Sequence, residues 1–198
     1  MSTIIMSTII ETPRAQIGSA PVRPAPAYTM TARVLHWITA VAILLMLPLG
    51  WASANEWGGA WQDWLYDLHR SIGAALIPLV LVRVIYRIMH PPLPLPDAIA
   101  PLQRLAAAGT HWALYALLLA QPIIGWIATS AYPAPIPVFG LFELPPLSSA
   151  NRALSDRLFA LHAGCGIAIA GIVALHVGAA CHHHFVRKDR VLLRMLTG

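Results

Sequence analysis

Four apolar segments, each long enough to cross a lipid bilayer as a helix, constrain this chain more than any other feature. They cover about residues 33–53, 68–89, 110–131 and 156–185. Inside a membrane only helices and closed barrels satisfy every backbone polar group, and segments of about 20 apolar residues fit helices. Of the 198 residues, 58% are hydrophobic and 11% are charged, against about 25% charged in a typical soluble domain. We therefore predict an all-α fold, a bundle of four transmembrane helices within residues 30–198.

The first 29 residues do not follow this pattern. MSTII occurs twice in succession and is followed by a stretch rich in proline and alanine. The apolar pieces are too short for the core of a secretory signal. We predict a disordered N-terminal tail over residues 1–29, and Met6 or Met30 remains open as the true start.

The charges between the apolar segments predict the orientation of the helices. Basic residues dominate before the first segment, between the second and third, and after the fourth, whereas the first connection is acidic until Arg70. Loops rich in Lys and Arg remain in the cytoplasm, so both termini and the second connection are predicted to be cytoplasmic. The opposite interface carries four tryptophans at positions 51, 57, 61 and 64. The net charge of +5 does not indicate nucleic-acid binding, because the basic residues form no patch interleaved with aromatic residues.

Two histidines in the fourth segment, His162 and His176, are its most informative polar residues. They are fourteen residues apart, nearly four helical turns, so both rings leave the same helix face roughly 21 Å apart along the axis. With the orientation above, His69 lies at the depth of His162, and His36 at the depth of His176. Facing histidines in a helical bundle are suited to bind a b-type haem through two axial imidazoles. The pattern thus predicts two haems with the ligands His36, His69, His162 and His176.

Two alternatives to haem stay open for these four histidines. Membrane histidines often serve only as hydrogen-bonding core residues, although four that pair by depth favour a cofactor. Zinc is the rival metal, but two rings at each depth are too few for its usual four ligands. Gly73 and Gly166 follow His69 and His162 by four residues, and a glycine one turn away on the same face would give a flat macrocycle room near the backbone.

The remaining histidines have several possible roles. His111, without a level partner, is predicted to be structural or to contact a quinone, and His90, before two prolines, an interfacial loop residue. The run His182–His184 either binds a metal or forms a cationic helix end. Three glycines at positions 164, 171 and 178 predict helix packing, and Cys165 and Cys181 are predicted to pack in the core.

Several of these stretches resemble the bacterial cytochrome b561 family. The similar segments are TARVLHWITA, LHRSIG, HWALYALLLAQPIIGW, LHAGCG and LHVGAACHHHFVRKDRVLLRM, which together lie within residues 28–196. The resemblance implies a four-helix cytochrome of the bacterial inner membrane whose haem ligands fall on the same four histidines. It also implies oxidation of periplasmic superoxide at the outer haem and reduction of ubiquinone near the inner one, with His183 as a candidate quinone contact.

Two functions remain in view. The first is a superoxide:quinone oxidoreductase, in which His183, His111 or a water relays protons to the quinone. The second is a cytochrome b subunit that anchors a partner dehydrogenase or hydrogenase and passes its electrons to quinone. A purely structural membrane protein would leave the level-paired histidines unexplained.

Overall fold

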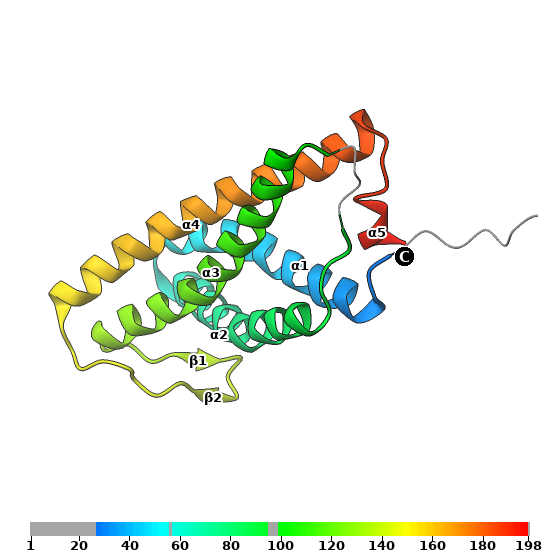
Figure 1. Cartoon of the computed structure of the whole chain (residues 1–198). Coiled ribbons are helices and arrows are strands. Elements are labelled where there is room, and N and C mark those ends of the chain that lie inside the picture. The colour runs from blue at the N-terminus through cyan, green and yellow to red at the C-terminus, as the bar shows by residue number, and fades with distance from the viewer. Residues whose placement is uncertain (1–26, 56, 95–98, 198) are drawn as a thin grey trace, which may run out of the picture.

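The computed structural model describes residues 27–55, 57–94 and 99–197 and contains four long helices (Figure 1). The helices are α1 (Met30–Ser53), α2 (Gly59–Met89), α3 (Pro101–Ala131) and α4 (Arg152–Cys181), followed by the π-helix η1 (His182–Val186) and the short α5 (Leu193–Leu196). The long helices, with η1 extending α4, have the length and hydropathy of membrane spans. The chain is therefore a multi-pass membrane protein. The predicted tail lies almost wholly outside the described residues.

All four long helices begin earlier than the apolar segments predict. α2 begins at Gly59 instead of near residue 68, and α3 at Pro101 instead of near residue 110. Helix geometry satisfies the backbone on both sides of a membrane boundary, so a helix need not end where its apolar stretch ends. Local signals set the observed starts: Pro101 is at the first helical turn, where its missing N–H costs nothing. The side chain of Asn151 caps α4 by accepting from the N–H of Leu154 at 3.0 Å.

The fold is mostly helical, as predicted, but a small β-hairpin between α3 and α4 was not predicted. Strands β1 (Pro137–Val138) and β2 (Phe142–Glu143) pair antiparallel. The N–H of Leu141 donates to the carbonyl of Val138 at 3.0 Å, and both central turn residues, Phe139 and Gly140, have positive φ. Two positive φ angles match the right-handed twist of a hairpin. These strands are only two residues long and lie in a proline-rich stretch, so the sequence carries no clear strand pattern.

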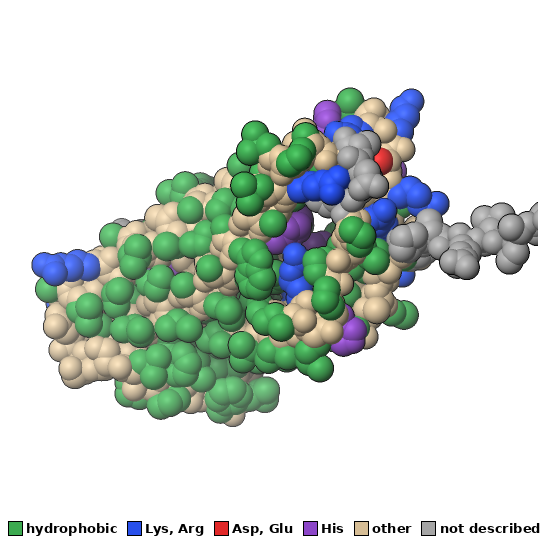
Figure 2. Space-filling model, viewed as in Figure 1, with side chains coloured by type: hydrophobic (Ala, Val, Ile, Leu, Met, Phe, Trp, Pro, Cys, Tyr) green, Lys and Arg blue, Asp and Glu red, His purple; other side chains and the backbone are tan. Residues whose placement is uncertain are grey.

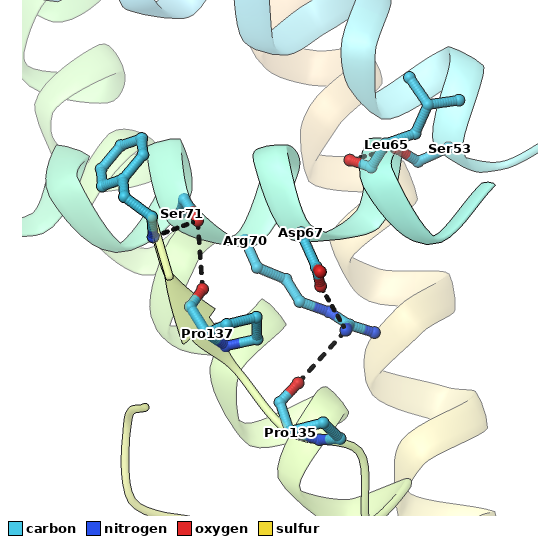
Figure 3. Close-up of polar contacts among 8 residues, drawn as sticks. Ser53, Leu65, Asp67, Arg70, Ser71, Pro135 and Pro137 are labelled. Carbon is cyan, nitrogen blue, oxygen red and sulfur yellow. Dashed lines mark hydrogen bonds and ion pairs between the residues drawn. The ribbon is translucent and has the colours of Figure 1, made fainter. Parts of the chain in front are cut away.

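Hydrogen bonds from Arg70 and Ser71 on α2 hold the hairpin and the residues before it against this helix (Figure 3). The Ser71 hydroxyl donates to the carbonyl of Pro137 at 3.1 Å and accepts from the N–H of Phe139 at 2.9 Å. Arg70 donates to the carbonyl of Pro135 at 3.2 Å and lies 3.6 Å from the Asp67 carboxylate. These bonds hold the loop over the end of the bundle that contains His69.

Helix packing places the core midway along the bundle. α1 packs on α2, α2 on α3, and α3 on α4. The buried core lies between the depths of the paired histidines and consists of Ile43, Leu76, Val80, Tyr115, Leu118 and Ile169. Hydrophobic side chains also cover much of the outer surface (Figure 2), as expected for helices surrounded by lipid.

Both ends of the described chain meet at the end of the bundle that contains His36. The N–H of Tyr28 donates to the carbonyl of Arg194 at 3.3 Å, and the indole of Trp37 donates to the carbonyl of Met195 at 3.0 Å. Figure 2 shows basic side chains gathered where the C-terminal segment lies. The two termini of the described chain therefore lie on the same side of the membrane-spanning region.

Candidate functional site

The structure brings the predicted histidine pairs together at two depths. The ring centres of His69 on α2 and His162 on α4 are 6.0 Å apart, with an angle of 71° between the planes. The ring centres of His36 on α1 and His176 on α4 are 6.3 Å apart, at 63°. We call these arrangements the His69–His162 level and the His36–His176 level. Helix α4 contributes one ring to each level.

Each histidine pair bridges two helices that do not pack closely against each other. Among the described residues, α4 packs closely on α3 but makes no comparable packing with α1 or α2. Each histidine pair nevertheless joins α4 to one of these two helices. The imidazoles therefore face each other where the helices stand apart.

A fourteen-residue spacing recurs in all four long helices. It separates His36 from Gly50 in α1, His69 from Arg83 in α2, His111 from Gly125 in α3, and His162 from His176 in α4. Fourteen residues are nearly four turns, so both members of each pair leave the same face. The prediction used this spacing only in α4. Extended to the other helices, it would have found Gly50, Arg83 and Gly125.

Two of these glycines make room for the rings at the His69–His162 level. A Cβ added to Gly50 would lie 3.1 Å from Cε1 of His69, and one added to Gly125 would lie 3.0 Å from Cε1 of His162. The two glycines that the sequence singled out, Gly73 and Gly166, are less tightly packed. A Cβ added to Gly166 or Gly73 would meet its nearest side-chain atom at 3.5 or 3.7 Å. Glycine is thus required most where a helix backbone meets a histidine ring.

Gln121 on α3 holds His162 in a defined orientation. Nδ1 of His162 lies 3.1 Å from the Gln121 carbonyl, and the Gln121 amide donates to the His162 carbonyl at 2.8 Å. A carbonyl only accepts, so Nδ1 carries the proton and the lone pair is left on Nε2. This support from the backbone is typical of a metal-binding histidine. In contrast, Nδ1 of His69 is buried without a hydrogen-bond partner among the described residues.

The His36–His176 level contains two further polar residues. The ring of His111 lies 5.1 Å from that of His176, so His111 lies at this depth beside a histidine that is already paired with His36. Its Nδ1 lies 2.7 Å from the carbonyl of Ala107, one turn earlier. The guanidinium of Arg83 lies 2.7 Å from Nδ1 of His36. Sequence reasoning missed Arg83, because a basic residue in an apolar segment was counted only as a topology signal.

His183, the predicted quinone contact, belongs to a polar cluster beyond α4. Its Nδ1 lies 2.5 Å from the Asp189 carboxylate, which also accepts from the N–H of Val191 at 3.0 Å. Partial burial raises the pKa of Asp189, but these hydrogen bonds and the nearby Arg187 outweigh it, so the pKa lies below its ordinary value. Asp189 therefore remains a carboxylate and orients the His183 ring.

The remaining predictions have mixed outcomes. His90 is exposed, stacked on Tyr86 with ring centres 4.1 Å apart, and lies at the end of α2. The run His182–His184 begins η1 at the end of α4, and within the described ranges no three His, Cys, Asp or Glu side chains are grouped to hold a metal ion. A Cβ added to Gly164, Gly171 or Gly178 would meet nothing within 4 Å, so their predicted packing against a helix of this chain is wrong. Cys181 is exposed, not in the core.

Comparison with known proteins decides the family. The model of the family described as "Prokaryotic cytochrome b561" matches residues 27–198. The chain belongs to the prokaryotic cytochrome b561 family. It is 36% identical over 171 residues to "Cytochrome b561 homolog 2" of Escherichia coli K12, covering 85% of this chain and 90% of that protein. It is 32% identical over 165 residues to "Probable superoxide oxidase CybB" of Yersinia pestis, covering 82% and 91%.

The cytochrome b561 family implies membrane electron transfer and b-type haem, and the paired rings fit this group. If the two rings bound one metal ion from opposite sides, each through one nitrogen at about 2.0 Å, the usual metal–imidazole length, the ring centres would lie roughly 6 Å apart. The His69–His162 and His36–His176 separations meet this condition. The 5.1 Å between His111 and His176 does not. The unpartnered nitrogen of His69 and the glycines at the rings agree with a site built for a ligand.

Proposed function

We propose that this cytochrome b561 holds two b-type haems, one between His69 and His162 and the other between His36 and His176, and moves electrons across the inner membrane. The observation that carries the proposal is the pair of facing imidazoles at each of two depths, 6.0 and 6.3 Å between ring centres. A haem bound by two imidazoles supplies one-electron transfer as its iron changes between the ferric and ferrous states. The protein contributes the ligands, their spacing and the surrounding charge.

The charge distribution supports an orientation with the His36–His176 level toward the cytoplasm. Among the described residues, that end of the bundle carries eight basic side chains at positions 33, 83, 87, 104, 187, 188, 190 and 194, against the single acid Asp189. Segments rich in Lys and Arg remain in the cytoplasm. Both termini would then be cytoplasmic and the hairpin periplasmic.

For the electron donor we propose periplasmic superoxide, and for the acceptor ubiquinone. Two superoxide anions give up one electron each and leave as two molecules of oxygen, while one quinone takes both electrons with two protons and becomes a quinol. The similarity to a probable superoxide oxidase supports the donor.

His183 is proposed to contact the quinone and to pass protons to it. Asp189 accepts from its Nδ1, so the Nε2 nitrogen is available to the substrate. Asp189 holds the ring in place while a proton passes through Nε2. His111, next to His176, is a second candidate for this relay.

The test begins with haem content. The purified wild-type protein is expected to contain two low-spin b haems per chain. His162→Ala should lose one haem and His176→Ala the other, while His90→Ala, at an exposed position, should lose neither. If wild type binds no haem, or if both single variants keep two, the proposal is wrong.

Stopped-flow mixing with superoxide and a soluble quinone analogue then tests the donor. Superoxide oxidase activity predicts rapid superoxide consumption that requires the quinone. A haem-loaded protein that does not react with superoxide and that co-purifies with a larger redox subunit would instead support the relay and anchor function.

A further inference from the structure

Two arginines of α2 meet at one aromatic ring near the His36–His176 level. Arg83 and Arg87 are four residues apart, so they share a helix face. Their guanidinium carbons lie 5.5 and 5.7 Å from the centre of the Tyr115 ring. Tyr115 is 6% exposed and belongs to the core. Two positive charges are thus held side by side within a membrane-spanning helix.

No carboxylate of the described residues balances these charges. The acids in the described ranges are Asp63, Asp67, Glu143, Asp156 and Asp189, and none of them forms an ion pair with Arg83 or Arg87. Positive charge inside a membrane is costly unless it is paired. Tyr115 offers only the face of its ring. Among the residues that the structure describes, this arginine pair therefore has no anionic partner.

The hydrogen bond between Arg83 and His36 determines which nitrogen of His36 can bind a metal. A guanidinium only donates, so Nδ1 of His36 accepts from Arg83 at 2.7 Å. A neutral imidazole has one lone pair, and here Arg83 occupies it, so Nε2 carries the proton. His36 cannot bind a metal through Nε2 until Arg83 has released Nδ1. A carboxylate would draw Arg83 away, because charge-assisted bonds to guanidinium are about twice as strong as neutral ones.

We propose that Arg83 and Arg87 bind the carboxylate side chains of the haem at the His36–His176 level, and that this binding frees His36 to hold the iron. The inference rests on the proposed function. Figure 2 shows histidine and basic side chains around a hollow at this end of the bundle. At the other level Arg70 cannot play this part, because it is already engaged by Asp67 and the carbonyl of Pro135.

The test uses the full-length protein carrying haem labelled with ¹³C in its carboxyl groups. Reduced-minus-oxidised infrared difference spectra report the labelled carboxylates of wild type, Arg83→Gln, Arg83→Lys and Arg87→Gln. The matched control is Arg152→Gln, an exposed arginine at the far end of the bundle whose partner is Asp156. The rate of haem transfer to a scavenging apoprotein and the phospholipid phosphorus per chain are measured on the same samples.

We expect the labelled bands of one haem to shift in Arg83→Gln and Arg87→Gln, and that haem to leave about 10-fold faster, as the loss of a charge-assisted bond predicts. Arg83→Lys should shift the bands less, and the control should match wild type. Unchanged bands in all three variants would overturn the inference. Unchanged bands with a loss of phosphorus would assign the arginines to a lipid phosphate and overturn it too. A wild type without haem would instead refute the proposed function, at a stage before any variant is compared.

Discussion

Gly125→Ala tests whether the fourteen-residue register makes space for a metal-binding ring. The added methyl would lie 3.0 Å from Cε1 and 3.2 Å from Nδ1 of His162. Carbon atoms pack best at about 3.5–4.0 Å, so the ring or the helix must move by roughly 0.5–1 Å. The ring has little freedom, because Nδ1 is bonded to the Gln121 carbonyl. Overpacking costs about 1–3 kcal/mol, which exceeds the ~1 kcal/mol that alanine gains over glycine in a helix.

The expected result is the loss of one haem from the His69–His162 level. Disturbing the support of a metal-bound histidine typically lowers affinity about 10–100-fold, enough to leave purified Gly125→Ala with close to one haem per chain. Gly50→Ala should have a smaller effect. Its methyl would lie 3.1 Å from Cε1 of His69, but the Nδ1 of that ring has no partner among the described residues to hold it in place.

The assay combines the haem-to-protein ratio with the low-temperature electron paramagnetic resonance signals of the two ferric haems. Gly171→Ala is the matched control on α4, because its methyl would meet nothing within 4 Å. It should keep both haems. The reasoning is refuted if Gly125→Ala keeps two haems with wild-type signals, or if Gly171→Ala loses as much haem as Gly125→Ala.

Three further predictions follow from single contacts. Asp189→Asn should slow quinone reduction severalfold while both haem spectra stay unchanged, because the His183 ring loses its charged partner; equal rates would contradict this. Because the pKa of Asp189 lies below its ordinary value, the contact should persist at neutral pH and be lost only as the pH falls through that lowered pKa, which hydrogen exchange of residues 187–196 checks. Ser71→Ala leaves the N–H of Phe139 without its acceptor and should cost about 1–3 kcal/mol, seen as faster exchange in the hairpin, whereas Ser149→Ala, at an exposed position, should have no such effect.

The sequence was sufficient to predict the four helices and the pairing of histidines by depth. Membrane helices rise regularly, so sequence separation converts directly into depth once charges set the direction. The rotation of each helix about its axis is set by packing between helices and not by the local sequence. The two hydrogen bonds between Gln121 and His162 could therefore not be predicted. Gly50 and Gly125 are different, since applying the spacing of His162 and His176 to the other helices would have revealed them.

The two levels also differ in charge, and this difference predicts the direction of electron flow. Arg83 and Arg87 lie at the His36–His176 level without a carboxylate partner among the described residues, whereas Arg70, near the other level, has Asp67 at 3.6 Å. Positive charge stabilises the reduced iron relative to the oxidised iron. Because two haems of one type carry the same charge, a difference between their potentials would come from the surrounding protein charges.

On the proposed function, the haem at the His36–His176 level should therefore have the higher midpoint potential, and electrons should run downhill toward the end with His183. Redox titration of wild type resolves two potentials, and His162→Ala identifies which belongs to the remaining haem. A lower potential for that haem would mean that local charge does not set the direction.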